Sequence, residues 1–151
     1  MSTAASAPFS RNFLTSLFNW ILPAQNRRKF KRVRVPFLLR YVVEASGTGA
    51  VTNLKDLSAG GVLFASNQPL LQGGNLKLEI NLPTVEKPIS ASARVVRVSK
   101  GAQSGIYRIA TKFIDLNPQD KKLIRQLIER MARHRKDKNL VNRKKRIWSL
   151  S

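Results

Sequence analysis

The chain is 151 residues long, which is enough for one domain with its own core and about forty residues of terminal extensions. It has no cysteine and one histidine, so we expect neither a disulfide framework nor a metal site built from cysteine or histidine. The start of the chain lacks the pattern of a secretory signal, and no segment reaches the roughly 20 apolar residues that a membrane span needs. We therefore expect a cytoplasmic protein.

The net charge of +20 is concentrated at the two ends of the chain. Residues 1–40 contain eight Lys or Arg and no acid, and residues 116–151 contain twelve bases and three acids, whereas residues 41–115 contain eight bases and five acids. Ends of this kind favour anionic partners: nucleic acid, acidic lipid or a phosphorylated ligand. Charge alone does not choose among these partners.

The first segment, residues 1–26, is expected to be a tail with one short helix. Apolar side chains recur at helical spacing from Phe9 to Leu22, and Pro23 ends the pattern. This amphipathic helix could dock on its own domain or on a second subunit of a homo-oligomer. The alternatives are contact of residues 9–22 with a partner protein or with the inner membrane, to which the protein would then be peripheral.

From Val33 onwards the apolar period changes from helical spacing to two, which is typical of strands with one buried face. Pro36 lies inside the first of these runs and predicts an edge or a bend there. Six strands joined by short glycine-marked turns indicate a small antiparallel barrel or sandwich. The predicted strands cover residues 33–43, 50–57, 62–65, 76–80, 89–98 and 106–114.

A helix is predicted after the last strand, with Asn117 as its N-cap and Pro118 at its first position. One apolar stripe should lie against the strands; it contains Leu123, Ile124, Leu127, Ile128 and Met131. Beyond His134 the chain is expected to be a basic tail, residues 136–151. This tail is either disordered and solvated or able to bind nucleic acid or acidic lipid.

Two arginines, Arg28 and Arg32, stand four residues apart just before the first predicted strand. The planar guanidinium fork suits phosphate oxygens, the O6/N7 edge of guanine and stacking on a flat ring. Both side chains could therefore fold over a ligand that lies on the strands. The alternative is that they are merely two of the seven bases between Arg27 and Arg40, all of them solvated.

A second motif, Asp56, Ser58 and Gly61, lies on a predicted turn. Asp and Ser often cap their own backbone in turns, and glycine supplies the positive φ that many turns need. The functional alternative is that Asp56 accepts hydrogen bonds from a guanine N–H edge, Ser58 contacts base or phosphate, and Gly61 allows close approach of the backbone. A carboxylate beside a phosphate ligand favours a purine nucleotide over bare phosphate or lipid.

The order of the two motifs, Arg28-x-x-x-Arg32 and then Asp56-x-Ser58-x-x-Gly61, resembles the PilZ domain family of bacterial cyclic di-GMP receptors. The resemblance covers about residues 27–132 and implies a mainly β fold, a six-stranded antiparallel β-barrel with a C-terminal helix packed on it. It implies that the two arginines clamp phosphates and guanine, while Asp56, Ser58 and the glycines Gly60 and Gly61 hold the other side of a guanine.

In the same family, the residue before the first motif arginine influences whether one ligand or an intercalated pair is bound. Here that residue is Arg27, a long cation that could stack between bases, which favours a cyclic di-GMP dimer. The expected domain occupies residues 27–135, between the N-terminal segment and the basic tail.

We expect a binding protein and not an enzyme, because there is no cysteine nucleophile, no second histidine and no carboxylate pair that the sequence places together. The expected function is a nucleotide-binding receptor in second-messenger signalling, with cyclic di-GMP as its ligand and no cofactor or metal, which changes conformation and signals to a downstream protein. The alternatives are a basic nucleic-acid-binding barrel and a PilZ-like scaffold that binds no ligand.

Overall fold

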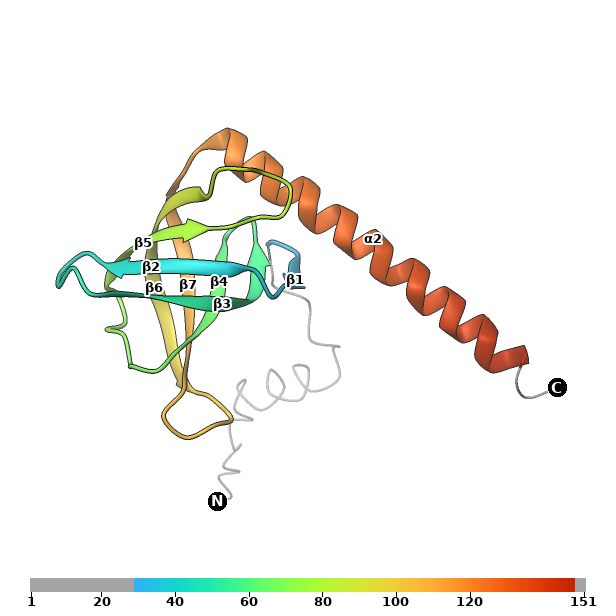
Figure 1. Ribbon diagram of the computed structural model, residues 1–151, viewed down its shortest axis with the longest axis horizontal. Coiled ribbons are helices and arrows are strands. Elements are labelled where there is room, and N and C mark those ends of the chain that lie inside the picture. The colour runs from blue at the N-terminus through green and yellow to red at the C-terminus, as the bar shows by residue number, and fades with distance from the viewer. Residues whose placement is uncertain (1–28, 149–151) are drawn as a thin grey trace, which may run out of the picture.

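The computed structural model describes residues 29–148 of the chain. The predicted N-terminal helix, Phe9 to Leu22, and the arginines Arg27 and Arg28 lie outside the described residues. The described part contains seven strands and one helix (Figure 1): β1 (Arg32–Arg34), β2 (Leu38–Val43), β3 (Gly49–Ser58), β4 (Gly61–Ser66), β5 (Asn75–Ile80), β6 (Ile89–Lys100), β7 (Tyr107–Leu116) and α2 (Pro118–Trp148).

The strands form one closed antiparallel barrel. Its ring runs β3-β2-β5-β6-β7-β4, and pairing of β4 with β3 closes it. The short strand β1 pairs with the second half of β3, and β2 pairs with the first half. Closure leaves the ring without a free edge, which removes the usual site of edge-to-edge aggregation.

The first predicted strand, residues 33–43, is present as two pieces, β1 and β2, that both pair with β3. The break contains Pro36, which has no N–H to give to a ladder. Hydrogen bonds continue on each side of it, from the Val35 N–H to the Lys55 carbonyl (3.3 Å) and from the Leu54 N–H to the Phe37 carbonyl (2.8 Å). The predicted bend at Pro36 is therefore confirmed. The predicted six-stranded antiparallel barrel is also confirmed, by the closed ring of strands.

The core fills the inside of the ring with the alternating residues of its strands. In β5, for example, Leu76, Leu78 and Ile80 are buried while the residues between them are exposed. The core also receives Phe64 of β4, Ile109 of β7 and Leu39 of β2, each fully buried. A period of two is therefore sufficient to set which side chains enter the barrel.

The helix α2 begins as predicted, because the Asn117 side-chain oxygen accepts a hydrogen bond from the Gln119 N–H (2.9 Å). Its first half packs against β1 and β3 and buries Ile124, Leu127 and Ile128. The helix then continues to Trp148, past the predicted start of the basic tail at residue 136. No glycine or proline follows Pro118, so nothing in the backbone chemistry ends the helix earlier.

Candidate ligand-binding site

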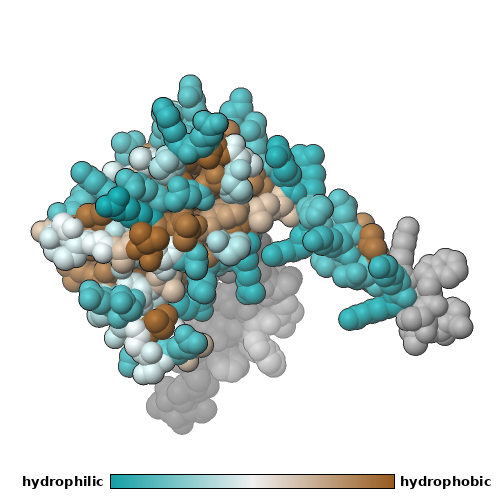
Figure 2. Space-filling model, in the orientation of Figure 1, coloured by the Kyte–Doolittle hydropathy of each residue, from teal (hydrophilic) through white to brown (hydrophobic). Residues whose placement is uncertain are grey.

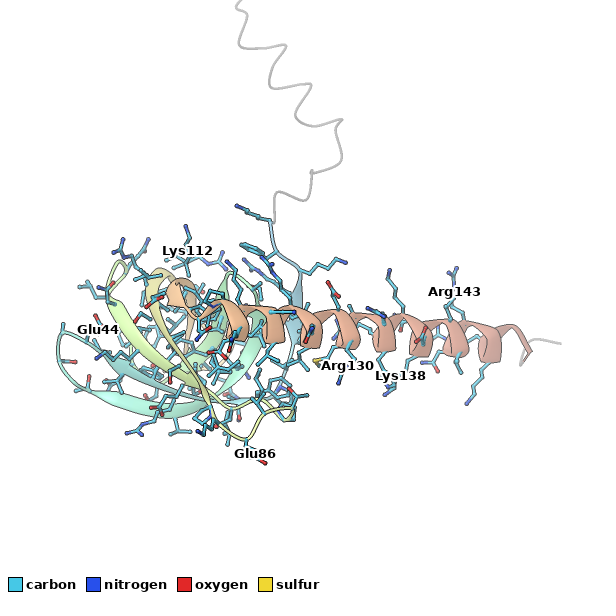
Figure 3. The ribbon with its side chains drawn as sticks, turned by 90° about the horizontal axis from the view of Figure 1, so that it is seen from above. Glu44, Glu86, Lys112, Arg130, Lys138 and Arg143 are labelled. Carbon is cyan, nitrogen blue, oxygen red and sulfur yellow. The ribbon has the colours of Figure 1, made fainter. Side chains whose placement is uncertain are left out.

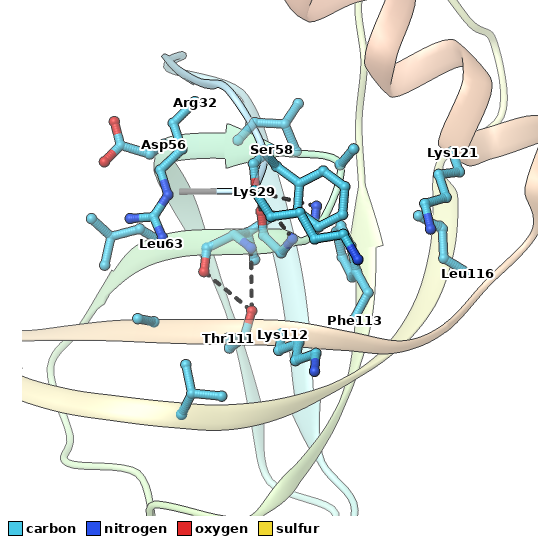
Figure 4. Close-up of a pocket in the computed structure, with 18 of the residues that line it drawn as sticks. Lys29, Arg32, Asp56, Ser58, Leu63, Thr111, Lys112, Phe113, Leu116 and Lys121 are labelled. Carbon is cyan, nitrogen blue, oxygen red and sulfur yellow. Dashed lines mark hydrogen bonds between the residues drawn. The ribbon is translucent and has the colours of Figure 1, made fainter. Parts of the chain in front are cut away.

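A pocket of about 620 Å³ lies where β1, the turn between β3 and β4, β7 and the start of α2 meet (Figure 4). It brings together five of the seven residues that the sequence predicts for the site. These are Arg32, Asp56, Ser58, Gly60 and Gly61. The other two, Arg27 and Arg28, lie outside the described residues, and their place in the site stays a prediction.

Asp56 reaches the pocket because of a β-bulge in β3. The register between β3 and β4 shifts between Leu54 and Asp56, so that Lys55 is an extra residue without a partner on β4. Leu54 and Leu57 are both buried, although regular alternation would place residues three apart on opposite faces of a strand. Asp56 between them is only half-buried. The bulge thus lets β3 keep both leucines in the core while the carboxylate lines the pocket.

Arg32 is brought to the same pocket by the pairing of β1 with β3. Its backbone partner is Ser58, and the next residue of β1, Val33, is buried in the core. The Arg32 side chain is therefore exposed and lies near Asp56 at the rim (Figure 4). Among the described residues, ion pairs join Arg40 to Glu79 and Arg133 to Glu129, so neither Arg32 nor Asp56 is used in one.

Ser58 holds the turn of residues 58–61 in shape. Its hydroxyl donates to the Gly61 carbonyl (2.9 Å) and accepts from the N–H groups of Gly60 (3.3 Å) and Gly61 (3.1 Å). The residue is buried, with 7% of its surface exposed. The hydroxyl therefore caps its own turn, and its direct contact with a ligand stays a prediction.

The two glycines of the turn are needed for space and not for backbone conformation. The expectation of a positive φ here is wrong, since the described glycines with positive φ are Gly47, Gly73 and Gly105. A Cβ at Gly61 would collide with the carbonyl oxygen of Thr111 on β7. The turn is pressed onto β7 by a further hydrogen bond, from the Phe113 N–H to the Gly60 carbonyl (2.9 Å).

Phe30, which lies between the two motif arginines, covers Gly60. A Cβ on Gly60 would lie 2.5 Å from the nearest ring carbon, so the ring rests directly on the glycine backbone. The ammonium groups of Lys29 and Lys121 are each 5.9 Å from the ring centroid, within reach of a cation–π contact. In the sequence, the one signal of this contact is that an aromatic residue stands between the two motif arginines.

Lys121 shows what the sequence alone could not predict. It belongs to the first turn of α2, far along the chain from the two motifs, and only the fold brings it to the pocket. With Lys29, Arg32 and Lys112 it gives the lining four bases against two acids, Asp56 and Asp115. This balance suits an anion that also offers N–H donors to a carboxylate.

Thr111 forms part of the pocket floor and links β7 to β4. Its hydroxyl donates to the Val62 carbonyl (3.1 Å) and accepts from the Val62 N–H (3.4 Å). Across residues 29–148 there is no group of three or more His, Cys, Asp or Glu that could hold a metal ion. None of the helices in this range is long and apolar enough to cross a membrane.

A model of the PilZ domain matches residues 26–130, which is more than half of the chain. The chain therefore belongs to the PilZ domain family. The matched range begins just before the predicted arginine motif and ends within α2.

Three of the proteins to which this chain is similar are a sequence relative and two solved structures. The mannuronan synthase of Pseudomonas aeruginosa is 28% identical over 113 residues, which are 73% of this chain and 28% of that protein. The Bacillus subtilis inhibitor of motility, MotI/DgrA, has a TM-score of 0.64 at 20% identity, covering 75% of this chain and 57% of that one. The PilZ domain of Escherichia coli YcgR, solved with c-di-GMP, has a TM-score of 0.58 at 22% identity, covering 74% of this chain and 98% of that one.

Proposed function

We propose that this chain is a cyclic di-GMP receptor domain and not an enzyme. The observation that carries the proposal is the pocket in which Arg32 and Asp56, neither of them in an ion pair among the described residues, flank a turn fixed by Ser58. The family membership and the c-di-GMP in the YcgR domain support the choice of ligand.

The chemistry of the pocket fits the two kinds of group in cyclic di-GMP. The arginine fork suits phosphate oxygens or the O6/N7 edge of guanine, whereas the Asp56 carboxylate can only accept, and the Watson–Crick edge of guanine offers it N–H donors. A volume of about 620 Å³ lies within the usual range of small-molecule pockets. In this proposal Arg28 joins Arg32 on the phosphates, and Arg27 stacks between bases of an intercalated pair.

Phe30 gives the proposal a conformational step. The ring covers Gly60, the surface on which a guanine would lie beside Asp56. Ligand entry therefore displaces Phe30 and reorders residues 27–32, and a downstream protein partner reads that change. The division into residues 1–26, 27–135 and 136–151, and a cytoplasmic location, remain part of the proposal.

Titration calorimetry with cyclic di-GMP tests the proposal on the full chain. The wild type should release heat at tens of micromolar ligand, and the fitted ratio should report two ligands per chain if Arg27 favours the pair. Arg32→Ala and Asp56→Ala should each weaken binding by about 100-fold, since each removes charge-assisted hydrogen bonds. Arg108→Ala is the matched control, because Arg108 is exposed on β7 and does not line the pocket.

Two outcomes would contradict the proposal. No heat from the wild type would indicate a scaffold that acts only through protein contacts. Binding of DNA or RNA that falls steeply with salt and is unchanged in Arg32→Ala, without binding of cyclic di-GMP, would indicate a basic nucleic-acid-binding barrel.

A further inference from the structure

The second half of α2 projects away from the barrel. From Arg133 onwards every described side chain of the helix is exposed, and the last buried residue is Ile128 (Figures 1 and 3). Residues 133–148 amount to about 24 Å of helix. The described side chains of this projecting helix, residues 133–148, add nothing to the barrel core, so its sequence is free to serve another surface.

The projecting helix has one apolar face. Leu140 and Val141 are large hydrophobic residues with 58% and 52% of their surfaces exposed. The two residues are adjacent, so together they form one exposed apolar patch on the side of the helix. Figure 2 shows an apolar patch near the far end of this otherwise hydrophilic helix.

Most of the basic residues lie on the flanks of the apolar face or opposite to it. With 100° of rotation per residue, six of them lie at least about 80° from the centre of the apolar face. They are Arg135, Lys136, Lys138, Arg143, Lys145 and Arg146. Arg133 and Asp137 also fall on the apolar side of the helix; the long stem of an arginine can lie along apolar surface with its charge outside it.

We propose that the projecting helix is a docking surface for an anionic lipid membrane. A helix with an exposed apolar face and a face rich in Lys and Arg lies in the membrane interface, with apolar side chains beneath the headgroups and cations among them. Eight Lys or Arg against one acid between residues 133 and 146 supply the charge complementarity.

Two other occupants fit these observations less well. A second copy of the helix would bring eight bases against eight bases, and like charges repel. Nucleic acid would satisfy the charge but would leave Leu140 and Val141 in water or against phosphates. An acidic lipid surface satisfies both faces at once.

Co-sedimentation of the full chain with vesicles tests this proposal independently of cyclic di-GMP. The protein should bind vesicles of equimolar phosphatidylcholine and phosphatidylglycerol and not vesicles of phosphatidylcholine alone, and binding should fall with added salt. The double variant Leu140→Gln/Val141→Gln should bind at least about tenfold more weakly, since two apolar side chains no longer enter the interface. The matched control is Val51→Gln/Leu71→Gln, which changes residues that are 66% and 82% exposed on the barrel.

A second set of variants removes single positive charges and tests the electrostatic part of vesicle binding. Replacing one base of the polar face, as in Lys145→Gln, should weaken vesicle binding about fivefold, whereas Lys100→Gln on the exposed end of β6 should not. In a Trp20→Phe background, Trp148 is the only tryptophan, and its fluorescence should shift to shorter wavelength on the anionic vesicles. Circular dichroism checks that each variant keeps the helix.

Four results would overturn the proposal. They are absence of binding to the anionic vesicles, equal binding by the Leu140/Val141 variant and the wild type, binding of duplex DNA instead of vesicles, and self-association abolished by the same variant. Loss of vesicle binding in Leu14→Gln/Phe18→Gln, with Leu140→Gln/Val141→Gln unaffected, would assign membrane contact to residues 9–22 instead.

Discussion

The turn of residues 58–61 and the segment of residues 29–32 form two walls of the same pocket, but different forces hold them. The turn is buried, capped by the Ser58 hydroxyl and pressed onto β7 at Gly61. The segment is largely exposed and is held by the Phe30 ring on Gly60 and by the short pairing of β1. A receptor that must respond to its ligand needs both kinds of wall, a fixed surface to bind on and a weaker one to move.

The largest expected effect is on the fixed wall. Gly61→Ala places a methyl group against the Thr111 carbonyl, which belongs to the backbone of β7 and cannot rotate away. We expect a loss of about 3 kcal/mol in the free energy of unfolding and a decrease of about 10 °C in Tm, measured by thermal and urea denaturation.

Gly47→Ala is the matched control for that variant. Gly47 has a positive φ of 68° but nothing within 4 Å of its would-be Cβ, so only backbone strain opposes the alanine. Its cost should be about 1 kcal/mol. Equal effects of the two variants would show that close approach to β7 is not what Gly61 provides.

Removing the Ser58 hydroxyl should have the next largest effect. Ser58→Ala removes the hydroxyl that accepts from the N–H groups of Gly60 and Gly61 and donates to the Gly61 carbonyl, at an expected cost of about 2 kcal/mol in the free energy of unfolding. Ser46→Ala, which removes a hydroxyl from an exposed turn, should cost about 0.5 kcal/mol or less. If both variants cost the same, the Ser58 cap does not fix this wall.

On the weaker wall, Phe30→Ala separates stability from ligand affinity. Removing a half-buried ring from Gly60 should lower the free energy of unfolding by only about 1 kcal/mol. If the ring competes with guanine for this surface, the affinity for cyclic di-GMP in calorimetry should rise about fivefold. Weaker binding in Phe30→Ala would mean that the ring stays in place and stacks on the ligand.

Much of this architecture follows from local rules. The apolar period of two predicts the strands, and Pro36 predicts the break between β1 and β2. Asn117 and Pro118 predict the start of α2. Gly61 shows the limit of such rules, because a glycine between two strands reads as a turn residue and its actual constraint is a carbonyl on a strand about fifty residues later. Lys121 is unpredictable for the same reason, since only the closed fold places α2 beside the motifs.

The helix α2 extends beyond the start of the predicted basic tail for a different reason. A run of like charges indicates a solvated tail, and repulsion among its bases opposes a helix. Lysine, arginine and leucine nevertheless have high helix propensity, and the run contains neither glycine nor proline. For these residues the absence of glycine and proline is a better predictor of helix than the charge run is of a disordered tail.

Hydrogen exchange should show the smallest but most direct difference between the two walls. The amides of Gly60 and Gly61 are bonded to Ser58 before any ligand binds, so their exchange should change little when cyclic di-GMP is added. Amides of residues 29–32 should become protected as the segment closes over the ligand. Equal protection of both walls would contradict a fixed and a moving wall, whereas an unchanged segment beside measurable binding heat would mean that the pocket is already in its bound form.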